Sequence, residues 1–256
     1  MTLPAPSVLQ TPATAPRQWT KSADRPLRSG RKSLGIWCMA RALGVAVPWG
    51  AVRQTDGAAL LAFEHDRLQA LAAAGERVPA VLSFDGQHLV TSDIGTTLDR
   101  WLDAAPAGER LPVMCQACAD LAGFHARGQW HGGSQTRNLT WDGQRFSRLD
   151  FEERLVPGMP LDLVQRYDAL QLLLSMTRHL EPLGPDAVLQ VLEAYTRAGG
   201  GRVPDLRPFV QRLLPRLRAV LWLVGWSTRL RHSREARRLR TVLDGMSAFV
   251  AGRPAG

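Results

Sequence analysis

The sequence predicts an α+β fold with a few short strands in its first half and a mainly helical second half. Alternating apolar and polar residues at Trp19–Lys21 and His88–Ser92 are typical of half-buried strands. Asp142-Gly143 separates two further short apolar arms, and Asp-Gly favours the tight turn of a β-hairpin. Beyond residue 160, long leucine-rich segments indicate helices.

Length and composition indicate a globular protein. A chain of 256 residues with 45% hydrophobic residues can bury a sizeable core in one two-lobed domain. The three cysteines are too few and too irregularly spaced for a disulfide framework, which favours a reducing, cytoplasmic location. We interpret Cys115 and Cys118 as core residues. No signal sequence and no run of about 18 apolar residues is recognisable, so we expect neither export nor a membrane span.

The positive charge is concentrated near the C-terminus. The segment Arg202–Arg240 contains eleven arginines and two acidic residues, and thus carries the chain's whole formal net charge of +9. The apolar stretch Ala219–Trp226 within it leaves two alternatives. The favoured alternative is a helix that packs on the fold with its arginines outward. The other is peripheral attachment at the inner face of the membrane, since arginine and tryptophan together suit an anionic membrane surface. No nucleic-acid partner is expected, because no motif for one accompanies the charge.

The first elements of the chain surround a single lysine. Residues 1–16 have the composition of a disordered arm. Lys21 follows on the first predicted strand and is one of only two lysines among 32 basic residues, which indicates a specific role for its ammonium group. The segment Ser29–Leu43 predicts an inserted amphipathic helix that ends before Gly44 and Pro48.

A helix and two strands come next. The pattern of Leu60–Ala74 predicts a helix that contains Glu64 and stops at Gly75. The segments Val78–Leu82 and His88–Ser92 predict two strands that turn at Asp85-Gly86. The following loop leads to a helix for which Thr97 is a suitable N-terminal cap.

The remaining elements are helices on either side of the hairpin. Pro112–Ala126 predicts a helix that supports the loop before the hairpin. Pro160–Leu180 predicts one long helix that is buried nearly all round, in which Asp168 would be costly to bury without a partner. After Asp186–Ala198 and a glycine-rich break, Pro208–Val250 predicts two or three basic helices.

The hairpin region carries the chemistry. Its predicted arms are Asn138–Trp141 and Arg145–Leu149, and Asp150-Phe151-Glu152 follows directly. The ribbon therefore brings the Asn138 amide and the Asp150 carboxylate to the same end. Both side chains offer the hard oxygen ligands that magnesium prefers.

This pattern resembles the protein-kinase superfamily, in particular the bacterial lipopolysaccharide-core (Kdo/heptose) kinases and the RIO-type kinases. Kinases have a His-Arg-Asp catalytic loop, an Asn five residues after that Asp, and then Asp-Phe-Gly. Here the corresponding residues are His131-Gly132-Gly133, Asn138 and Asp150-Phe151-Glu152. Gly133 thus replaces the catalytic-base Asp, and no Gly-rich loop is recognisable ahead of Lys21.

The resemblance implies a two-lobed kinase-like fold. It would consist of a reduced N-lobe sheet over residues 17–91, a mainly helical C-lobe over 92–200 and basic C-terminal helices over 201–256. ATP and Mg²⁺ would be the cofactors. The residues implied in binding are Lys21 with its partner Glu64 for the phosphates, Ser92 and Ile94 at the adenine-binding hinge, and Asn138 and Asp150 for the metal.

The resemblance also implies roles in and around the catalytic loop. His131 and Asp168 would support the loop structurally. Arg137 would reach the transferred phosphoryl group or its acceptor, and Asp150 would act in catalysis as well as in metal binding. Gln135 could orient the acceptor hydroxyl, and Glu152 could serve as a further ligand or as a base.

The implied function is an ATP- and magnesium-dependent phosphotransferase. Only Glu153–Met159 separates the metal site from the next helix, which leaves no clear peptide-docking segment and favours a glycolipid or other small hydroxyl acceptor over a protein. A general base contributes about 10²–10⁴-fold to a rate, so Gly133 predicts a slow or an inactive enzyme. Two alternatives remain: a pseudokinase that binds nucleotide as a regulatory or scaffold module, and a peripheral membrane protein without nucleotide.

Overall fold

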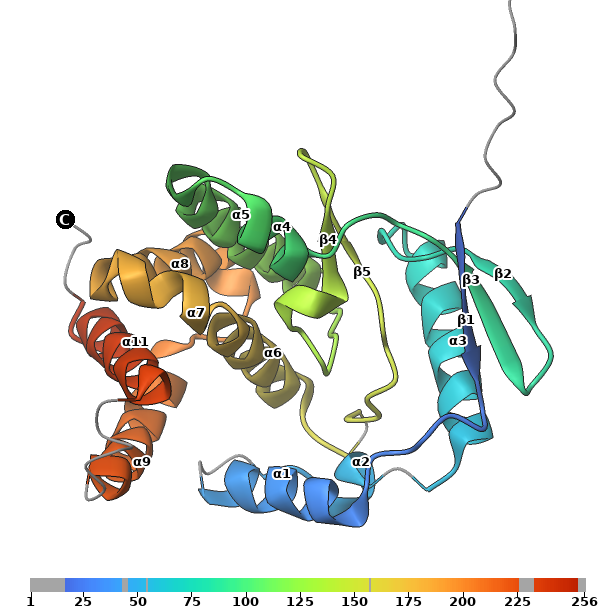
Figure 1. Ribbon diagram of the computed structural model, residues 1–256, viewed down its shortest axis with the longest axis horizontal. Helices are drawn as coiled ribbons and strands as arrows, with labels where there is room; N and C mark the ends of the chain where they lie inside the picture. Colours follow the sequence, from blue (N-terminus) through green and yellow to red (C-terminus); the bar gives the residue numbers. More distant parts are fainter. Residues whose placement is uncertain (1–16, 43–45, 54, 157, 226–232, 253–256) are drawn as a thin grey trace, which may run out of the picture.

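The computed structural model describes residues 17–42, 46–53, 55–156, 158–225 and 233–252. The fold is α+β and mainly helical, with two small antiparallel sheets (Figure 1). The predicted disordered arm of residues 1–16 lies outside the described residues, as do Leu43 and Gly44 at the end of the first predicted helix and Trp226 of the apolar stretch.

The larger sheet has three strands in the order β1-β3-β2: β1 (Gln18–Ser22), β3 (His88–Ser92) and β2 (Val81–Phe84). All neighbouring strands are antiparallel, and Lys21 is paired with Leu89. Strand β2 begins three residues later than the sequence predicts. Pro79 accounts for the shift, because proline has no N–H to donate to a ladder.

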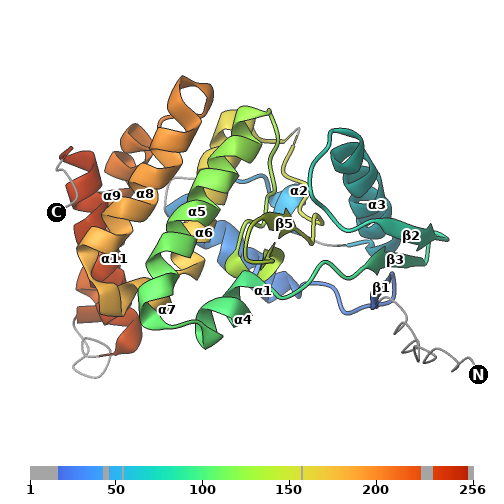
Figure 2. The ribbon, with the colours of Figure 1, turned by 90° about the horizontal axis from the view of Figure 1, so that it is seen from above.

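Helix α3 (Gly57–Ala73) lies against this sheet, at the opposite end of the molecule from the C-terminal helices (Figures 1 and 2). It begins at Asp56, whose side chain accepts a hydrogen bond from the Ala59 amide at 3.0 Å. The helix buries Leu61, Leu68 and Leu71 together with Glu64. Between β1 and α3 the chain forms α1 (Gly30–Ala42) and the short α2 (Trp49–Val52).

The predicted hairpin is confirmed, with slightly shorter arms. Strand β4 (Leu139–Trp141) pairs with β5 (Phe146–Arg148), and a 3₁₀ turn, η1 (Thr136–Asn138), precedes them. The carboxylate of Asp142 closes the turn by accepting hydrogen bonds from the amides of Gln144 and Arg145 at 2.8 and 2.7 Å.

The predicted cap at Thr97 is wrong in its chemistry. Thr97 does precede α4 (Leu98–Ala104), but its side chain accepts no hydrogen bond from the helix. Its hydroxyl instead donates to the Asp99 carboxylate at 2.6 Å. The carboxylate of Asp99 lies in the first turn of α4. Because an ionised carboxylate is a stronger acceptor than a neutral group, the Thr97 hydroxyl donates its proton to it.

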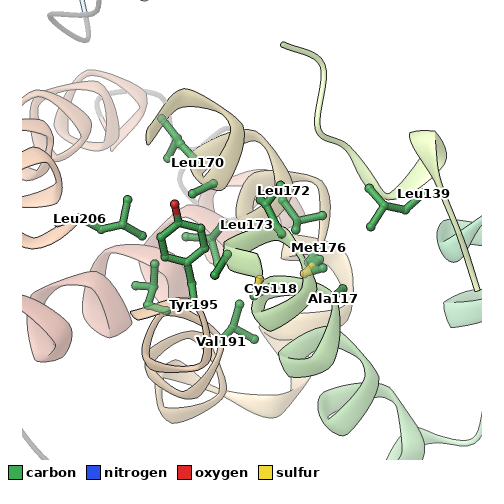
Figure 3. Close-up of a cluster of buried hydrophobic side chains, with 14 of the residues drawn as sticks. Ala117, Cys118, Leu139, Leu170, Leu172, Leu173, Met176, Val191, Tyr195 and Leu206 are labelled. Carbon is green, nitrogen blue, oxygen red and sulfur yellow. The ribbon is translucent and has the colours of Figure 1, made fainter. Parts of the chain in front are cut away.

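The helical part is built around α5 (Ala107–Ala126), which packs along α8 (Pro185–Gly199); α8 in turn packs against α11 (Arg234–Val250) (Figure 2). The other elements here are α6 (Leu161–Ser175), α7 (Thr177–Leu180), α9 (Arg207–Gly225) and the 3₁₀ turns η2 (Glu181–Leu183) and η3 (Gly200–Arg202). Figure 3 shows the core between them, where Cys118, Leu173 and Tyr195 lie close together. All three cysteines are free, and Cys118 is buried as predicted.

The long helix predicted over Pro160–Leu180 is wrong in two respects. It is broken at Met176, where the amide of Met176 donates to the carbonyl of Leu173 at 3.1 Å in place of the residue four back. The Ser175 hydroxyl donates to the Leu172 carbonyl at 2.8 Å and so competes with the helical ladder at this point. The helix is also not buried all round, since Leu161 and Leu174 are exposed.

The basic C-terminal region packs one face of α9 on the fold. Leu213 and Leu217 are buried, whereas Arg212 and Arg216 are exposed. This arrangement agrees with the interpretation in which the C-terminal helix packs on the fold and its arginines point outward. None of the helices within the described ranges combines the length and the apolarity that crossing a membrane would require.

Candidate active site

Lys21 connects two acidic side chains that are far apart in the sequence. Its ammonium donates to both carboxylate oxygens of Glu64, at 2.7 and 2.8 Å, and to Oδ1 of Asp150 at 2.6 Å. Strand β1 supplies the lysine, α3 supplies Glu64, and the segment after β5 supplies Asp150. The ion pair that the sequence predicts between Lys21 and Glu64 is therefore present.

The three groups perturb one another because they are largely removed from water. Burial would lower the pKa of Lys21, but the carboxylates of Glu64 and Asp150 outweigh burial and raise it. Burial raises the pKa of Glu64, and Lys21 only partly opposes that effect. Burial would likewise raise the pKa of Asp150, but the ammonium of Lys21 reverses the direction and holds it below its usual range. Asp150 is thus kept ionised.

The backbone of Asp150 is held in an uncommon conformation. It is the only non-glycine residue in the described ranges with a positive φ, of 69°. Asp and Asn tolerate this left-handed region better than other side-chain-bearing residues, but it is still less favourable than the usual regions. Such local strain is concentrated at functional sites, where surrounding contacts maintain it.

The loop before the hairpin is fixed by Asp168 of α6. Its fully buried carboxylate accepts hydrogen bonds from the backbone amides of His131 and Gly132, at 2.7 and 2.8 Å. This contact supports the structural role that the kinase resemblance implies for Asp168. It also supplies the partners without which a buried carboxylate would be costly.

His131 links the loop to the segment that carries Asp150. The amide of Gly133 donates to Nδ1 of His131 at 3.1 Å, so the neutral ring has its proton on Nε2, which donates to the carbonyl of Leu149 at 3.1 Å. Burial lowers the pKa of His131 to about 4, which keeps the ring neutral. The ring also stacks on Phe151, with centroids 4.4 Å apart. These contacts support the structural role predicted for His131.

The two glycines of the loop differ in the space around them. Gly132 has a φ of 86°, and a Cβ atom there would lie 2.9 Å from Cβ of Glu153, so a side chain at this position would be strained and would force its neighbours to shift. Gly133 has no such restriction. A Cβ at Gly133 would make ordinary contacts, at 3.5 Å from Nδ2 of Asn138 and 3.7 Å from Cγ of Glu153.

A pocket of about 280 Å³ opens between this loop and the segment after β5. That volume is near the lower end of the range for small-molecule sites. The pocket is lined by residues from the loop, the hairpin, α6 and the region around α1 and α2: Arg28, Val47, Val52, Gly132, Gly133, Gln135, Arg137, Asn138, Asp150, Glu152, Glu153, Leu155, Tyr167 and Gln171.

The structure thus brings together Gln135, Arg137, Asn138, Asp150 and Glu152 of the predicted site. Arg137 is exposed at the rim, with no ion-pair partner among the residues that the structure describes. The amide of Asn138 donates to the Gly133 carbonyl at 2.8 Å, and that of Gln135 donates to Gln171 at 3.1 Å.

The two predicted hinge residues lie apart from this pocket. Neither Ser92 nor Ile94 lines it. Ser92 ends β3, and its hydroxyl oxygen accepts a hydrogen bond from the Ala80 amide at 2.9 Å. Ile94 lies in the loop that leads to α4. Their predicted contact with adenine remains a prediction.

Two more ion pairs reinforce the contact between the N-terminal segment and the residues after β5. Arg25 pairs with Glu152, and Arg28 pairs with Glu153. Burial raises the pKa of Glu153, while Arg28 opposes that effect. The sequence prediction missed Arg25, Arg28 and Glu153. The only available signal was that both arginines closely follow Lys21, as the two glutamates closely follow Asp150.

The donor set fits a divalent cation that prefers oxygen. Carboxylate oxygens of Glu64, Asp150 and Glu152 all lie within 4.8 Å of one another. Asn138 lines the same pocket as Asp150 and Glu152 and carries a further oxygen. Carboxylate and amide oxygens with few protein ligands in total are typical of Mg²⁺ sites that also bind phosphates.

Comparison with known proteins gives one local similarity. No protein-family model matches the chain. Over 86 residues the chain is 32% identical to an uncharacterized protein of Haemophilus influenzae; the match covers 33% of this chain and 36% of that protein. The chain therefore spans about a third of the length of this relative, and the similarity carries no functional assignment.

Proposed function

We propose that the protein is an ATP- and magnesium-dependent phosphotransferase with a two-lobed, protein-kinase-like fold. The observation that carries this proposal is the position of Lys21 between Glu64 and Asp150. In protein kinases, a strand lysine pairs with a helix glutamate, and the Asp of Asp-Phe-Gly holds magnesium; both must be in place for activity. Lys21, Glu64 and Asp150 occur on the corresponding elements in the same order.

The loop before the hairpin supports the same proposal. Asp168 fixes the backbone of His131 and Gly132, and Asn138 follows at the spacing of the kinase metal ligand. Lys21, Glu64, Asp150 and Asp168, which span about 150 residues of sequence, therefore follow the order of the corresponding kinase residues and make contacts across the site. A core built only for stability would not require a lysine, a buried glutamate and a strained aspartate to meet.

Each residue has a role in this proposal. Asp150 and Asn138 would hold the ion, with Glu152 as a further oxygen donor, and the bound ion would supply neutralisation of phosphate charge. Lys21 would bind the inner phosphates while Glu64 orients its ammonium. Arg137, exposed at the rim, is free to contact the transferred group or the acceptor. Ser92 and Ile94 would meet the adenine at the connection between the two lobes.

The acceptor is proposed to be a hydroxyl group of a glycolipid or another small molecule. Helix α6 begins at Leu161, so the chain between Glu153 and Met159 is too short to dock an extended peptide. The exposed arginines of α9 are compatible with an anionic membrane surface at the inner face of the membrane. The protein is accordingly proposed to act in the cytoplasm.

A second candidate is a pseudokinase that binds nucleotide and transfers no phosphate. The observation that favours it is Gly133, which stands where kinases carry the catalytic-base aspartate. The binding residues would be the same in both proposals. Only turnover separates them.

The proposal is tested with ATP labelled in its γ-phosphate and Mg²⁺, incubated with the full chain and a membrane-lipid or small-molecule extract. The phosphotransferase proposal predicts ADP formation and label in a non-protein product. Stabilisation by ATP and Mg²⁺ with no transfer supports the pseudokinase. If ATP changes neither stability nor product and the protein still floats with liposomes, a membrane protein without nucleotide replaces both proposals.

A further inference from the structure

The absence of a side chain at Gly133 leaves space beside the predicted metal ligands, and another carboxylate lies next to that space. A Cβ built on Gly133 would lie 3.7 Å from Cγ of Glu153 and 3.5 Å from the amide nitrogen of Asn138. Both neighbours line the pocket that contains Asp150. The position that an aspartate at residue 133 would occupy is therefore adjacent to the side chain of Glu153.

The sequence offered two other residues, Gln135 and Glu152, in place of the missing catalytic aspartate, but each has another function in the structure. Gln135 donates to Gln171, which in turn donates to the Gly132 carbonyl at 2.8 Å. A neutral amide also has no site that accepts a proton at ordinary pH. The carboxylate of Glu152 belongs to the cluster with Glu64 and Asp150, and the proposed function assigns it to the metal ion.

We propose that Glu153 is the general base that replaces the aspartate missing at Gly133. The inference rests on the proposed phosphotransferase function and assigns a further catalytic residue within the same site. Glu153 comes from the segment after β5, whereas the kinase aspartate comes from the catalytic loop, so the carboxylate reaches the same pocket from a different part of the chain.

In the proposed transfer of the γ-phosphoryl group, Glu153 accepts the proton that the acceptor hydroxyl loses. The hydroxyl oxygen of the acceptor forms a bond to the γ-phosphorus of ATP, and the bond from that phosphorus to the β–γ bridging oxygen breaks. ADP leaves with the electron pair of the broken bond. The proton of the acceptor hydroxyl passes to the carboxylate of Glu153, which later releases it to water. With water as the acceptor, the same step yields ADP and inorganic phosphate.

Glu153 is well held for this task. Its carboxylate pairs with Arg28, and Arg28 is itself held by a hydrogen bond to the Val52 carbonyl at 3.1 Å. Its Cβ and carbonyl oxygen lie 2.9 and 3.3 Å from the position that a Cβ at residue 132 would occupy. The carboxylate is thereby fixed relative to the loop, and a general base requires such fixed placement within reach of its proton.

The test compares Glu153→Gln with wild type in the full-length protein. The glutamine keeps the shape and an oxygen for Arg28 but cannot accept the proton. ATP hydrolysis in the presence of Mg²⁺, measured as phosphate release, is expected to fall by about 10²-fold or more. The thermal shift produced by ATP and Mg²⁺ is expected to stay unchanged. Glu76→Gln is the matched control, because Glu76 is also a partly buried glutamate paired with an arginine, Arg127, and lies outside the pocket.

A second substitution that restores activity distinguishes Glu153 as a base from Glu153 as a structural residue. Adding Gly133→Asp to Glu153→Gln is expected to raise phosphate release by about tenfold or more, because a carboxylate returns to the same space. Should Glu153→Gln fold poorly, Glu153→Asp decides instead, since it keeps a proton acceptor and is expected to retain activity.

Outcomes against the inference differ from outcomes against the proposed function. Unchanged hydrolysis in Glu153→Gln overturns the inference and leaves the phosphotransferase proposal standing. A wild type that binds ATP without releasing phosphate overturns the inference and supports the pseudokinase. A wild type without any ATP-dependent stabilisation overturns both. Loss of the ATP-dependent thermal shift in Glu153→Gln shows a binding role in place of a base.

Discussion

The ammonium of Lys21 lies 2.6 Å from Oδ1 of Asp150, across 129 residues of sequence. This contact joins the first strand to the segment after the hairpin, and Asp150 also lines the pocket. A ligand with several phosphate groups and a divalent ion would satisfy the same two side chains separately, the lysine with phosphate and the aspartate with the ion. The contact is therefore compatible with the proposed ATP-binding site.

Lys21 and Glu64 are expected to be energetically coupled. Glu64 has only 3% of its side chain exposed, so Lys21→Met leaves a buried carboxylate without its counter-charge and should lower the free energy of unfolding by about 2–3 kcal/mol. Adding Glu64→Gln removes that carboxylate and should recover about 1–2 kcal/mol. Urea unfolding of the two single variants and the double variant measures the coupling. Additive losses would contradict the pair as we describe it.

Asp168 is expected to stabilise the fold through the loop. In Asp168→Asn one of the two oxygens becomes an NH₂ group that faces a backbone amide, which should cost roughly 2–4 kcal/mol. The control is Asp162→Asn on the same helix, whose exposed pair with Arg166 should contribute less than about 1 kcal/mol. Denaturant unfolding compares the two. Equal losses would mean that the buried hydrogen bonds of Asp168 contribute nothing special.

The neighbouring glycines Gly132 and Gly133 are expected to differ in how much stability they lose on substitution by alanine. Gly132→Ala combines a φ of 86° with a Cβ contact of 2.9 Å and should cost roughly 1–3 kcal/mol. Gly133→Ala meets only ordinary contacts and should change stability by less than about 1 kcal/mol, in either direction. Melting temperatures of the two variants check this. A large loss at Gly133 would show that no side chain fits there.

Stability is expected to depend on pH through His131. Its pKa is about 4 in the folded protein against 6.5 ordinarily, so the unfolded chain binds the additional proton as the pH falls below 6.5. The stability that neutral His131 contributes is complete above 6.5 and declines toward pH 4, by about 3 kcal/mol in total. Unfolding at pH 7 and pH 5 is compared in wild type and His131→Gln. The other buried histidines, His125 and His179, also have lowered pKa values, but both are present in both proteins, so their contributions cancel. A stability difference between the two proteins that does not change with pH would contradict the assignment.

The local features of the fold were predictable because their signals are local. Asp142-Gly143 specified the hairpin, since few residue pairs adopt the backbone of that turn easily. The long helices follow from their apolar periodicity. The break at Met176 was not predictable from periodicity, because it depends on how the Ser175 hydroxyl bonds to Leu172.

The site was predictable only where a residue type stood out or the kinase resemblance supplied a pairing. Lys21 stood out among arginines, and Asp168 stood out within an apolar helix. The pairs Arg25–Glu152 and Arg28–Glu153 join residues 127 and 125 positions apart. Their side chains are of types that are usually solvated, so residue type alone does not distinguish them from surface charges. Only the three-dimensional contact shows them to be partners.

The most direct test of the proposed ATP- and magnesium-binding site is a thermal-shift titration of wild type and Asp150→Asn with ATP, with and without Mg²⁺. Asparagine is chosen because it tolerates the left-handed backbone of residue 150. Asp142→Asn, in the exposed turn of the hairpin, is the control for the same chemical change. At about 100 times the dissociation constant, ATP with Mg²⁺ should stabilise wild type and the control by about 2.7 kcal/mol. The account predicts that Asp150→Asn loses the magnesium-dependent part of this shift; an equal, magnesium-dependent shift in Asp150→Asn, or no shift in wild type, would contradict it.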